Sequence, residues 1–370
     1  MSNDKSFPKQ ILQILISPYI GGVEVYTLEL DKKLIHRSVK VFILSNLNPI
    51  LNKLKSFKIT VFHIYGKKVG GVKRAFLVIL LQPIYFLYYF PLLIYFRFVK
   101  KIRNVHVQDI GEKFVLSPIC KLLGFNVIWT EHGILTSWLK NKFLWKYFKF
   151  VSHFADTIVA VSDLTREDLI NNLKIQPQKI QVIYNGVDLN IITETEAKES
   201  ENIIATYIGR MSIDKKIEDF LAIIPQKSEV EFRFVGDGDL LADLKGKYQH
   251  NHNIKFYGFQ SDKEKFLAET DIFVHPSLHP AEGMSLGALE AMGSGKPIVA
   301  FDTGGMKELV QSGVNGFLVP HGDYNEFIDR ISELAGSYKL RLTMGKKSRK
   351  IVEEKFNLEK NVEEFLKLLK

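Results

Sequence analysis

Two glutamates, Glu282 and Glu290, are separated by seven residues in a segment dominated by small and apolar residues, HPAEGMSLGALEAMGSGKPIVA (279–300). Each acid taken alone fits a hydrated surface carboxylate. Their shared position between two apolar segments weakens that interpretation, because a carboxylate removed from water requires hydrogen-bond donors or positive charge. The pair therefore indicates a site that receives a polar ligand.

The same segment predicts a helix that begins near Met284 and carries Gly283, Leu286 and Glu290 on one face. Backbone N–H groups at its start, those of Met284, Ser285 and Leu286, lack helical acceptors and favour an anion. If a diphosphate binds there, Glu282, which precedes the helix, can reach the chemical group attached beyond the phosphates. Glu290, further along the helix, can then accept hydrogen bonds from the paired hydroxyls of a ribose. One diphosphate-linked ligand therefore accounts for both acids.

Two further elements fit an anionic ligand. Arg210 ends the apolar segment IIATYIGR, and Lys215 follows at the start of the next helical pattern. Ligands bind beyond the carboxyl ends of strands in doubly wound sheets, and two cations suit a diphosphate, although exposed loop charges would look the same. Gly21 and Gly22 follow the first predicted strand, where the backbone can closely approach phosphate or sugar. They do not form the G-x-G-x-x-G dinucleotide motif.

These residues are positioned by strands that alternate with helical patterns. The predicted strands are QILQILIS, VKVFILS, ITVFHIY, NVHVQD, FNVIWTEHG, TIVAVS and IQVIYNGVD, and then IIATYIGR, VEFRFVGDG, NIKFYGF, DIFVHPS, KPIVAFD and GFLVP. The polar stretch 193–202 separates the two series and is interpreted as a linker. Such alternation predicts parallel sheets covered by helices on both faces, that is, an α/β chain of two doubly wound, Rossmann-like lobes.

The predicted domain organisation has three parts, and 370 residues suffice for two domains. Residues 1–188 form a first Rossmann-like domain, which is expected to face a membrane. Residues 189–352 form a second Rossmann-like domain, which is expected to bind the diphosphate-linked ligand. Residues 353–370 form an amphipathic helix that returns toward the first domain, and the two lobes face a central cleft.

Charge is unevenly distributed along the chain. Residues 1–185 contain 26 Lys and Arg against 11 Asp and Glu, whereas residues 186–370 contain 24 against 30. A basic first half indicates an anionic partner, either a membrane surface or nucleic acid. The single cysteine, Cys120, excludes an intramolecular disulfide, and the N-terminal sequence lacks a convincing signal peptide. These features predict a cytoplasmic protein.

The segment AFLVILLQPIYFLYYFPLLIYFRFV (75–99) is almost entirely apolar, and basic clusters flank it within 67–103. It is long enough to span a bilayer, but Pro83 and Pro91 would each disturb a continuous helix. We expect helices that lie in the membrane interface, with the basic flanks on anionic headgroups. The alternative is a buried helix pair in the first lobe. Because the aromatic residues form one apolar block and are not interleaved with basic residues, the pattern favours lipid over nucleic acid.

The ordered motifs resemble those of retaining glycosyltransferases of family 4, which have the GT-B fold. The E-x7-E pattern is EGMSLGALE, and the supporting motifs are GGVEVYTLEL, EHG, VIYNGVD, GRMSIDKK, FVGDGDL, KFYGF and GKPIVAFDTGG, spread over nearly the whole chain. The resemblance implies transfer of a sugar, a hexosyl group, from a nucleoside diphosphate with retained anomeric configuration. The basic, apolar first lobe adds the expectation of a membrane-associated acceptor, such as a lipid-linked glycan or glycolipid in surface polysaccharide assembly.

The resemblance also implies roles for the charged residues. Glu290 binds the ribose of the donor, and Glu282 lies beside the donor sugar. Arg210 and Lys215 contact the diphosphate.

Other matching residues complete the implied site. The loop of Gly21 and Gly22 closes over the phosphates, and His132 of the EHG motif faces the sugar. Gly258 and Phe259 of the KFYGF motif lie near the base.

The sequence departs from the family pattern at two places. Lys216 follows Lys215 where the family usually has glycine, and EGMS replaces the common EGFG at 282–285. The second change alters the surface beside the donor sugar, so the identity of the donor stays open.

The expected mechanism uses no protein nucleophile. The departing diphosphate, stabilised by Arg210, Lys215 and the helix N-terminus, accepts the proton of the incoming hydroxyl, while His132 orients the sugar. No metal cofactor is expected. The GDGD segment (236–239) is interpreted as a turn, and the two histidines of YQHNHN as part of a solvated loop.

Two other functions stay open at this point. A nucleotide-sugar 2-epimerase would share the two-lobe architecture, but it should lack the E-x7-E pattern and would not need the apolar segment 75–99. A non-catalytic membrane-binding or nucleic-acid-binding protein would use the basic lobe alone.

Overall fold

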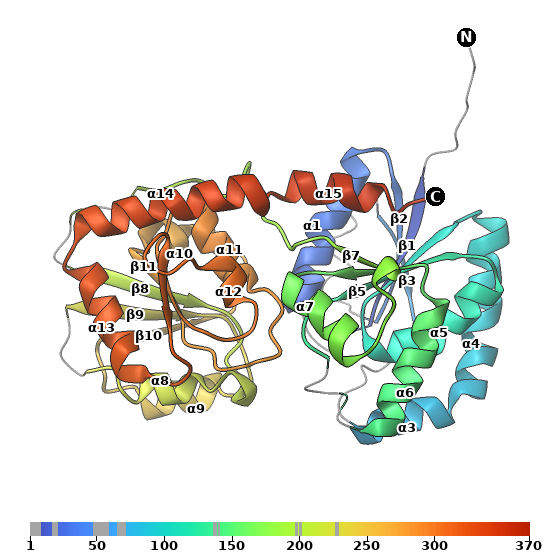
Figure 1. The fold of residues 1–370 in the computed structure, drawn as a ribbon, viewed down its shortest axis with the longest axis horizontal. Helices are drawn as coiled ribbons and strands as arrows, with labels where there is room; N and C mark the ends of the chain where they lie inside the picture. The colour runs from blue at the N-terminus through green and yellow to red at the C-terminus, as the bar shows by residue number, and fades with distance from the viewer. Residues whose placement is uncertain are drawn as a thin grey trace, which may run out of the picture. The chain divides into compact units, whose positions relative to one another are not determined.

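The computed structural model describes residues 9–16, 21–46, 59–64, 72–135, 139, 141–196, 199, 202–225 and 229–370. The chain forms two compact units (Figure 1). Unit 1 comprises residues 1–183 together with 359–370, and unit 2 comprises residues 184–358. The first unit thus ends five residues before the predicted boundary, and the polar stretch 193–202 belongs to unit 2.

Unit 1 is built on a seven-stranded parallel sheet in the order β3-β2-β1-β4-β5-β6-β7. Its strands are β1 (Gln10–Leu15), β2 (Lys40–Ser45), β3 (Thr60–His63), β4 (Asn104–Val107), β5 (Asn126–Glu131), β6 (Thr157–Ala160) and β7 (Ile180–Val182). The strand order reverses between β1 and β4, because the chain first builds β2 and β3 on one side of β1. Such a reversal opens a crevice at the carboxyl ends of these two strands.

Helices cover both faces of this sheet, as expected for parallel strands (Figure 1). They are α1 (Gly22–His36), α3 (Val72–Leu80), α4 (Gln82–Ile94), the π-helical turn η2 (Tyr95–Val99), α5 (Ile110–Leu122), α6 (Lys142–Val151), α7 (Asp163–Glu167) and α15 (Leu358–Leu366). Asp109 begins α5 because its carboxylate accepts a hydrogen bond from the Gly111 amide, 3.0 Å away.

The C-terminal helix α15 packs on unit 1. Glu359 forms an ion pair with Lys33 of α1 at 2.7 Å, and the ring of Phe365 lies 5.1 Å from that of His106 in β4. The last residue is fixed as well, because Asn104 donates a hydrogen bond to the carbonyl of Lys370.

The apolar segment 75–99 forms α3, α4 and η2, and Pro83 lies in the first turn of α4 while Pro91 lies inside that helix. One side of this group is buried, including Val78, Leu93 and Phe96. The other side is exposed, and it carries Phe76, Leu77, Leu80, Ile84, Phe86, Leu87, Tyr88, Ile94, Tyr95, Phe98 and Val99. Within the described residues, no helix is long and apolar enough to cross a membrane. The group is therefore part of the core on one side and an open apolar surface on the other.

Unit 2 contains a six-stranded parallel sheet in the order β10-β9-β8-β11-β12-β13. Its strands are β8 (Ile203–Ile208), β9 (Val230–Val235), β10 (Ile254–Gly258), β11 (Ile272–His275), β12 (Ile298–Phe301) and β13 (Gly316–Val319). Its helical elements are η6 (Ile213–Lys215), α8 (Ile217–Leu221), α9 (Leu241–Lys247), α10 (Glu264–Glu269), α11 (Leu286–Gly293), α12 (Met306–Leu309), α13 (Tyr324–Ala335) and α14 (Tyr338–Lys355). The strand order reverses between β8 and β11.

All the predicted strand segments form strands, and the predicted class of two Rossmann-like α/β domains is confirmed. The reason is local: the strands are short runs rich in β-branched and aromatic residues, and the central ones are buried on both faces under helices. In β12, for example, all four residues are buried.

Candidate active site

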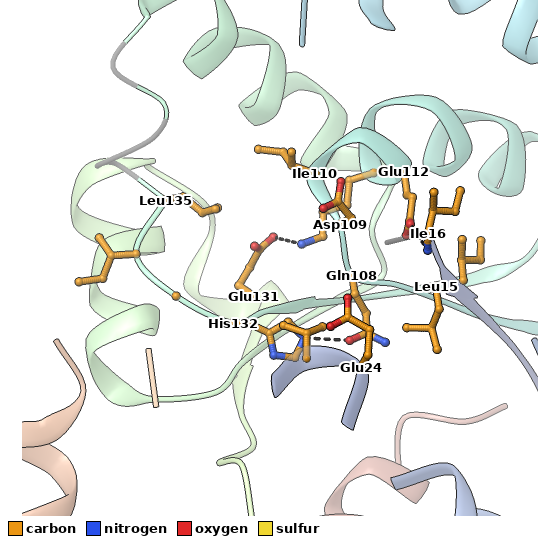
Figure 2. A pocket seen from close by; sticks show the side chains of 15 residues that line it. Leu15, Ile16, Glu24, Gln108, Asp109, Ile110, Glu112, Glu131, His132 and Leu135 are labelled. Atoms are coloured by element: carbon orange, nitrogen blue, oxygen red, sulfur yellow. Dashed lines mark hydrogen bonds and ion pairs between the residues drawn. The ribbon is translucent and has the colours of Figure 1, made fainter. Parts of the chain in front are cut away.

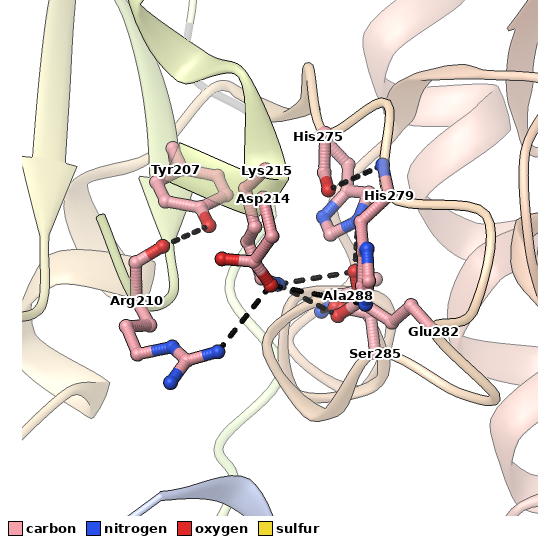
Figure 3. Close-up of polar contacts among 10 residues, drawn as sticks. Tyr207, Arg210, Asp214, Lys215, His275, His279, Glu282, Ser285 and Ala288 are labelled. Atoms are coloured by element: carbon pink, nitrogen blue, oxygen red, sulfur yellow. Dashed lines mark hydrogen bonds and ion pairs between the residues drawn. The ribbon is translucent and has the colours of Figure 1, made fainter. Parts of the chain in front are cut away.

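Lys215 and Glu282 form an ion pair where the strand order of unit 2 reverses. Lys215 ends η6, which follows β8, and Glu282 lies in the loop after β11. The ammonium of Lys215 is 2.9 and 3.0 Å from the two carboxylate oxygens of Glu282 (Figure 3). His275 Nε2, at the end of β11, lies 3.3 Å from the same carboxylate. The pair therefore occupies the crevice at which open α/β sheets bind ligands.

The environment keeps both partners charged. Burial alone would lower the pKa of Lys215, but the Glu282 carboxylate outweighs burial and raises that pKa above its ordinary value. Burial likewise opposes ionisation of Glu282, yet Lys215 and His275 hold the pKa of Glu282 well below its usual range. At neutral pH, Glu282 is consequently a carboxylate that accepts hydrogen bonds.

Arg210 lies in the loop after β8, near Lys215 but with a different partner. Its guanidinium is 3.4 Å from the carboxylate of Asp214, and it is 43% exposed. The backbone of this loop is stabilised by a hydrogen bond, because the buried Tyr207 hydroxyl donates to the Arg210 carbonyl at 3.1 Å (Figure 3). The two predicted cations thus lie in one loop, each beside an acid, and neither Asp214 nor His275 was singled out from the sequence.

Close backbone contacts explain the glycines around this loop. The Gly305 amide donates a hydrogen bond to the Glu282 carbonyl at 2.9 Å, and a Cβ on Gly305 would lie only 1.7 Å from the Gly283 carbonyl oxygen. A Cβ on Gly287 would lie 2.4 Å from the Ile208 carbonyl oxygen. Any larger residue at these positions would displace the loop that carries the site.

The helix after this loop begins later than the sequence predicted. α11 starts at Leu286, and Ser285 is its N-cap, with its hydroxyl accepting a hydrogen bond from the Ala288 amide at 3.4 Å. The predicted start near Met284 is wrong by two residues, so Gly283 lies in the loop and does not share a helical face with Glu290. The Ser285 hydroxyl accepts a hydrogen bond from a first-turn amide, so the loop ends and the helix begins at this residue. The sequence alone did not reveal this helix start.

Glu290 lies one turn into α11 and forms an ion pair with Lys263, which precedes α10. Its second carboxylate oxygen, Oε2, is buried and has no hydrogen-bond partner among the described residues. Gly258, with φ of +69°, ends β10, and Phe259, which is 56% exposed, begins the turn that leads to Lys263. Glu290 is therefore linked to this turn by a lysine that sequence reasoning missed.

The GDGD segment, residues 236–239, forms the turn after β9. The Asp237 carbonyl accepts a hydrogen bond from the Met211 amide at 2.9 Å, and a Cβ on Gly238 would lie 2.0 Å from the Met211 carbonyl oxygen. This turn therefore supports the loop that carries Arg210. Across the part of the chain that the structure describes, no group of three or more His, Cys, Asp or Glu residues could bind a metal ion.

Unit 1 contains a second candidate site at its own strand-order reversal. A cavity of about 280 Å³ lies at the carboxyl ends of β1, β4 and β5, and its lining includes Ile16, Glu24, Asp109, Glu112 and His132 (Figure 2). Four carboxylates line it when the buried Glu131 is included. Such a lining suits a ligand rich in hydroxyl groups, because carboxylates accept hydrogen bonds.

His132 follows β5 and is oriented by its neighbours in this cavity. Its Nε2 lies 2.8 Å from Gln108 Oε1, and the same oxygen is 2.9 Å from the Thr27 hydroxyl of α1. Behind it, buried Lys113 pairs with Glu131 at 2.7 Å (Figure 2). Burial raises the pKa of Glu131 although Lys113 opposes the shift. Gln108 and Lys113 were not identified from the sequence, since amide and lysine side chains carry no pattern of their own.

The glycine pair lies at the start of α1, beside the same cavity. Gly21 is the N-cap residue, and its amide donates a hydrogen bond to the Glu24 carboxylate at 2.8 Å. Gly22 is the first residue of the helix, and it is exposed. The predicted residues thus form two groups: Gly21, Gly22 and His132 in unit 1, and Arg210, Lys215, Gly258, Phe259, Glu282, Gly283, Met284, Ser285, Leu286 and Glu290 in unit 2.

Comparison with known families gives two matches that together cover most of the chain. Residues 20–191 match the model of "Glycosyltransferase Family 4", and residues 202–337 match "Glycosyl transferases group 1".

Individual relatives agree with these matches. A UDP-Gal:alpha-D-GlcNAc-diphosphoundecaprenol alpha-1,3-galactosyltransferase of Escherichia coli is 30% identical over 64% of this chain and 67% of its own length. An uncharacterised glycosyltransferase of Methanocaldococcus jannaschii is 28% identical over 95% of each chain. Among solved structures, HepE of Anabaena in complex with UDP-glucose superposes with a TM-score of 0.76 and 21% identity, over 97% of this chain and 99% of that one.

Proposed function

The chain belongs to the family 4 glycosyltransferases, and on that premise we propose that it transfers a hexosyl group from a nucleoside diphosphate to a membrane-associated acceptor, with retained anomeric configuration. The observation that carries the proposal is the Lys215–Glu282 pair at the strand-order reversal of unit 2. It combines a fixed cation for phosphate with a fixed acceptor for sugar hydroxyls.

The donor would bind in unit 2 with its diphosphate between two positive features. Arg210 and Lys215 would contact phosphate oxygens from one side, and the first-turn amides of α11 would do so from the other. Residues Gly283, Met284, Ser285 and Leu286 form this second wall.

The remaining donor groups would be bound further along the same loops. Glu290 Oε2, which is buried and lacks a partner among the described residues, would accept a hydrogen bond from a ribose hydroxyl. Gly258 and Phe259 would lie near the base, since Lys263 connects their turn to Glu290. Glu282 would accept hydrogen bonds from the donor sugar, with Lys215 and His275 fixing its orientation.

The proposed reaction is a front-face displacement. The bond between the anomeric carbon and the diphosphate breaks, the acceptor oxygen bonds to the same face of that carbon, and the acceptor proton passes to the leaving phosphate oxygen. Arg210 and Lys215 stabilise the charge on the departing diphosphate. His132, held by Gln108, would orient a sugar bound in the cavity of unit 1. No metal is required in this scheme, since fixed cations neutralise the diphosphate.

The acceptor class is inferred from the surface of unit 1. The exposed side of α3, α4 and η2 carries large apolar residues, among them Leu80 and Leu87, each 76% exposed. Lysines and arginines flank it, which suits the cytoplasmic face of a membrane with anionic lipids. Of the predicted basic cluster before this segment, Lys67 and Lys68 lie outside the described residues. The Escherichia coli relative is named for a lipid-linked acceptor, a diphosphoundecaprenol glycan, which supports the same class for this chain.

Calorimetric titration with UDP, GDP, ADP and CMP tests the donor site. We expect one nucleotide to bind, and Glu290→Ala to abolish that binding. Glu264→Ala is the matched control, because Glu264 is an exposed acid on neighbouring α10. Absence of binding by every nucleotide in folded protein would contradict the proposal.

A further inference from the structure

A basic pocket lies at the amino-terminal edge of the sheet in unit 1. Its volume is about 310 Å³, and four cationic side chains line it: Arg97 of η2, Arg103 before β4, Lys121 of α5, and Lys370. Parallel strands place all their amino ends at one edge and all their carboxyl ends at the other. The pocket is therefore separate from the cavity that contains His132, and the proposed transfer reaction does not use it.

Positive charge in this pocket exceeds the negative charge available to it. Among the described residues, Asp156 provides the only acidic side chain in the lining, and Asp156 Oδ1 is 2.7 Å from the Lys121 ammonium and 4.0 Å from that of Lys370. The other oxygen, Oδ2, accepts a hydrogen bond from the Val127 amide. Among the described residues, neither Arg97 nor Arg103 forms an ion pair with a carboxylate.

Lys179 lies close to Lys121 and Asp156, two residues that line this pocket. Its ammonium donates hydrogen bonds to the carbonyls of His153 and Ala155 at 3.0 Å. Burial lowers the pKa of Lys179, Asp156 opposes that shift, and the charge of Lys121 adds a smaller effect in the lowering direction.

Arg97 is already held in position for such an anion. Its guanidinium carbon lies 5.9 Å from the centre of the Phe125 ring and 5.6 Å from that of Phe98. Its Nε is buried and has no hydrogen-bond partner among the described residues. The neighbouring Gly124 has no side chain to cover the guanidinium, and a Cβ there would lie 3.8 Å from an Arg97 terminal nitrogen. A guanidinium fixed in this way presents paired donors that match a phosphate group.

Exposed apolar side chains border the pocket and indicate the source of the phosphate. Phe98 and Val99 lie next to Arg97 in sequence, with exposures of 59% and 64%, and Leu122 follows Lys121 with an exposure of 69%. Phe98 and Val99 belong to η2, which directly follows α4 and its exposed apolar side chains. A ligand that matches both features has a phosphate attached to an apolar body, which is the chemistry of a membrane phospholipid.

We propose that Arg97, Arg103, Lys121 and Lys370 form a binding site for the phosphate group of an anionic membrane lipid. The site would fix how unit 1 lies on the bilayer, because it adds a specific contact at one end of the apolar surface. The inference rests on the proposed membrane association, and it goes beyond that proposal by naming the lipid group and the residues that bind it.

Vesicle flotation of the full chain tests the site, with phosphatidylcholine vesicles compared with vesicles that also contain phosphatidylglycerol. The test variant is Arg97→Gln with Arg103→Gln. The control is Lys142→Gln with Lys146→Gln, which removes equal charge from exposed lysines of α6. Helix α6 borders the same surface, since the rings of Phe76 and Phe143 stack at 5.4 Å. Diffuse attraction alone would weaken both variants equally, on the order of fivefold per charge.

We expect the arginine variant to bind phosphatidylglycerol vesicles about tenfold more weakly than the lysine control. Arg97→Lys should also lose affinity, because an ammonium retains the charge but lacks the planar pair of donors. Thermal unfolding of each variant shows whether a loss of vesicle affinity reflects misfolding. If the arginine variants misfold, Lys121→Gln, at an exposed position, replaces them in the test.

Two further results separate the possible failures. The protein is titrated with soluble dihexanoyl phosphatidylglycerol and with inorganic phosphate. A lipid site should bind the phosphatidylglycerol more tightly. Equal affinity for both ligands would indicate a free-phosphate site and would overturn the lipid assignment. Equal losses for the two double variants would overturn the site while leaving membrane association intact. Absence of any vesicle binding by the unmodified chain would overturn both, without bearing on nucleotide binding.

Discussion

The ammonium of Lys215 lies within hydrogen-bonding distance of both carboxylate oxygens of Glu282, at 2.9 and 3.0 Å. The two residues are 67 positions apart in sequence and meet because β8 and β11 are adjacent parallel strands. The pair fixes a cation and an acceptor in one loop crevice, and it keeps each of them charged. Several properties of the protein should depend on it.

Replacing Lys215 by Gln should weaken binding of the nucleoside diphosphate by roughly 2 kcal/mol, about thirtyfold, because a charge-assisted hydrogen bond to phosphate is lost. Calorimetry measures the change. Lys216→Asn is the matched control: Lys216 is exposed and has a φ of +52°, a conformation that asparagine tolerates. Similar losses for both variants would contradict the specific role of Lys215.

The same pair should make stability depend on pH at both extremes. The pKa of Glu282 is depressed in the folded protein, so its contribution is present above its ordinary value of 4.5 and is lost as pH falls below it. The pKa of Lys215 is raised, so its contribution is complete below 10.5 and is lost as pH rises through the folded value. Chemical unfolding across pH should show both losses. Glu282→Gln should lower the free energy of unfolding by roughly 2 to 4 kcal/mol at neutral pH. It should also reduce the fall in stability that the unmodified protein shows as the solution becomes acidic.

Gly305→Ala should impair donor binding although the residue carries no functional group. Its Cβ would lie 1.7 Å from the Gly283 carbonyl oxygen, so the loop that carries Glu282 must move. Nucleotide affinity should fall at least tenfold, in line with the sensitivity of positioned sites to small displacements. Gly246→Ala is the control, because a Cβ at that position in α9 meets nothing within 4 Å. It should stabilise the protein by about 0.5 to 1 kcal/mol without changing affinity. Unchanged affinity in Gly305→Ala would contradict the loop placement.

Lys263→Met should weaken nucleotide binding through Glu290. Lys263 pairs with one carboxylate oxygen and leaves Oε2 for a ribose hydroxyl, so its removal frees the carboxylate to rotate. The affinity loss, about tenfold, should disappear when the titrated nucleotide is the 2′,3′-dideoxy analogue. Lys265→Met, at an exposed position on the same helix, is the control. A loss that persists with the dideoxy nucleotide would show that Lys263 acts elsewhere.

Leu80→Asp combined with Leu87→Asp should release the protein from anionic vesicles, because both side chains are 76% exposed on the apolar surface. Thermal stability should change little. Val314→Asp, at a partly exposed apolar position of unit 2, should leave vesicle binding unchanged. Vesicle binding that survives the double change would argue against the apolar surface as the membrane contact.

Much of the fold followed from the sequence. The strands are local runs rich in β-branched and aromatic residues and they alternate with helical patterns, so alternation alone predicts two parallel sheets. The E-x7-E segment likewise identified Glu282 and Glu290, because two acids in a small, apolar segment are conspicuous without tertiary information. The start of α11 was predicted two residues early, since a capping hydroxyl at Ser285 competes with helix formation in a way that periodicity does not reveal.

The partners of these residues were decided only by tertiary structure. His275, Lys263 and Gln108 follow strands or precede helices like many polar residues, and only the packing of parallel strands brings them to Glu282, Glu290 and His132. In the apolar segment, likewise, the sequence could not tell which residues are exposed. Tyr88 is 47% exposed, whereas the adjacent Tyr89 is 3% exposed.

The sequence by itself determined the element types and the two-lobe class, and it singled out Glu282 and Glu290, because these depend on composition and spacing along the chain. Tertiary structure decided which charges pair and which side of an apolar helix meets solvent, because both depend on neighbours that are distant in sequence.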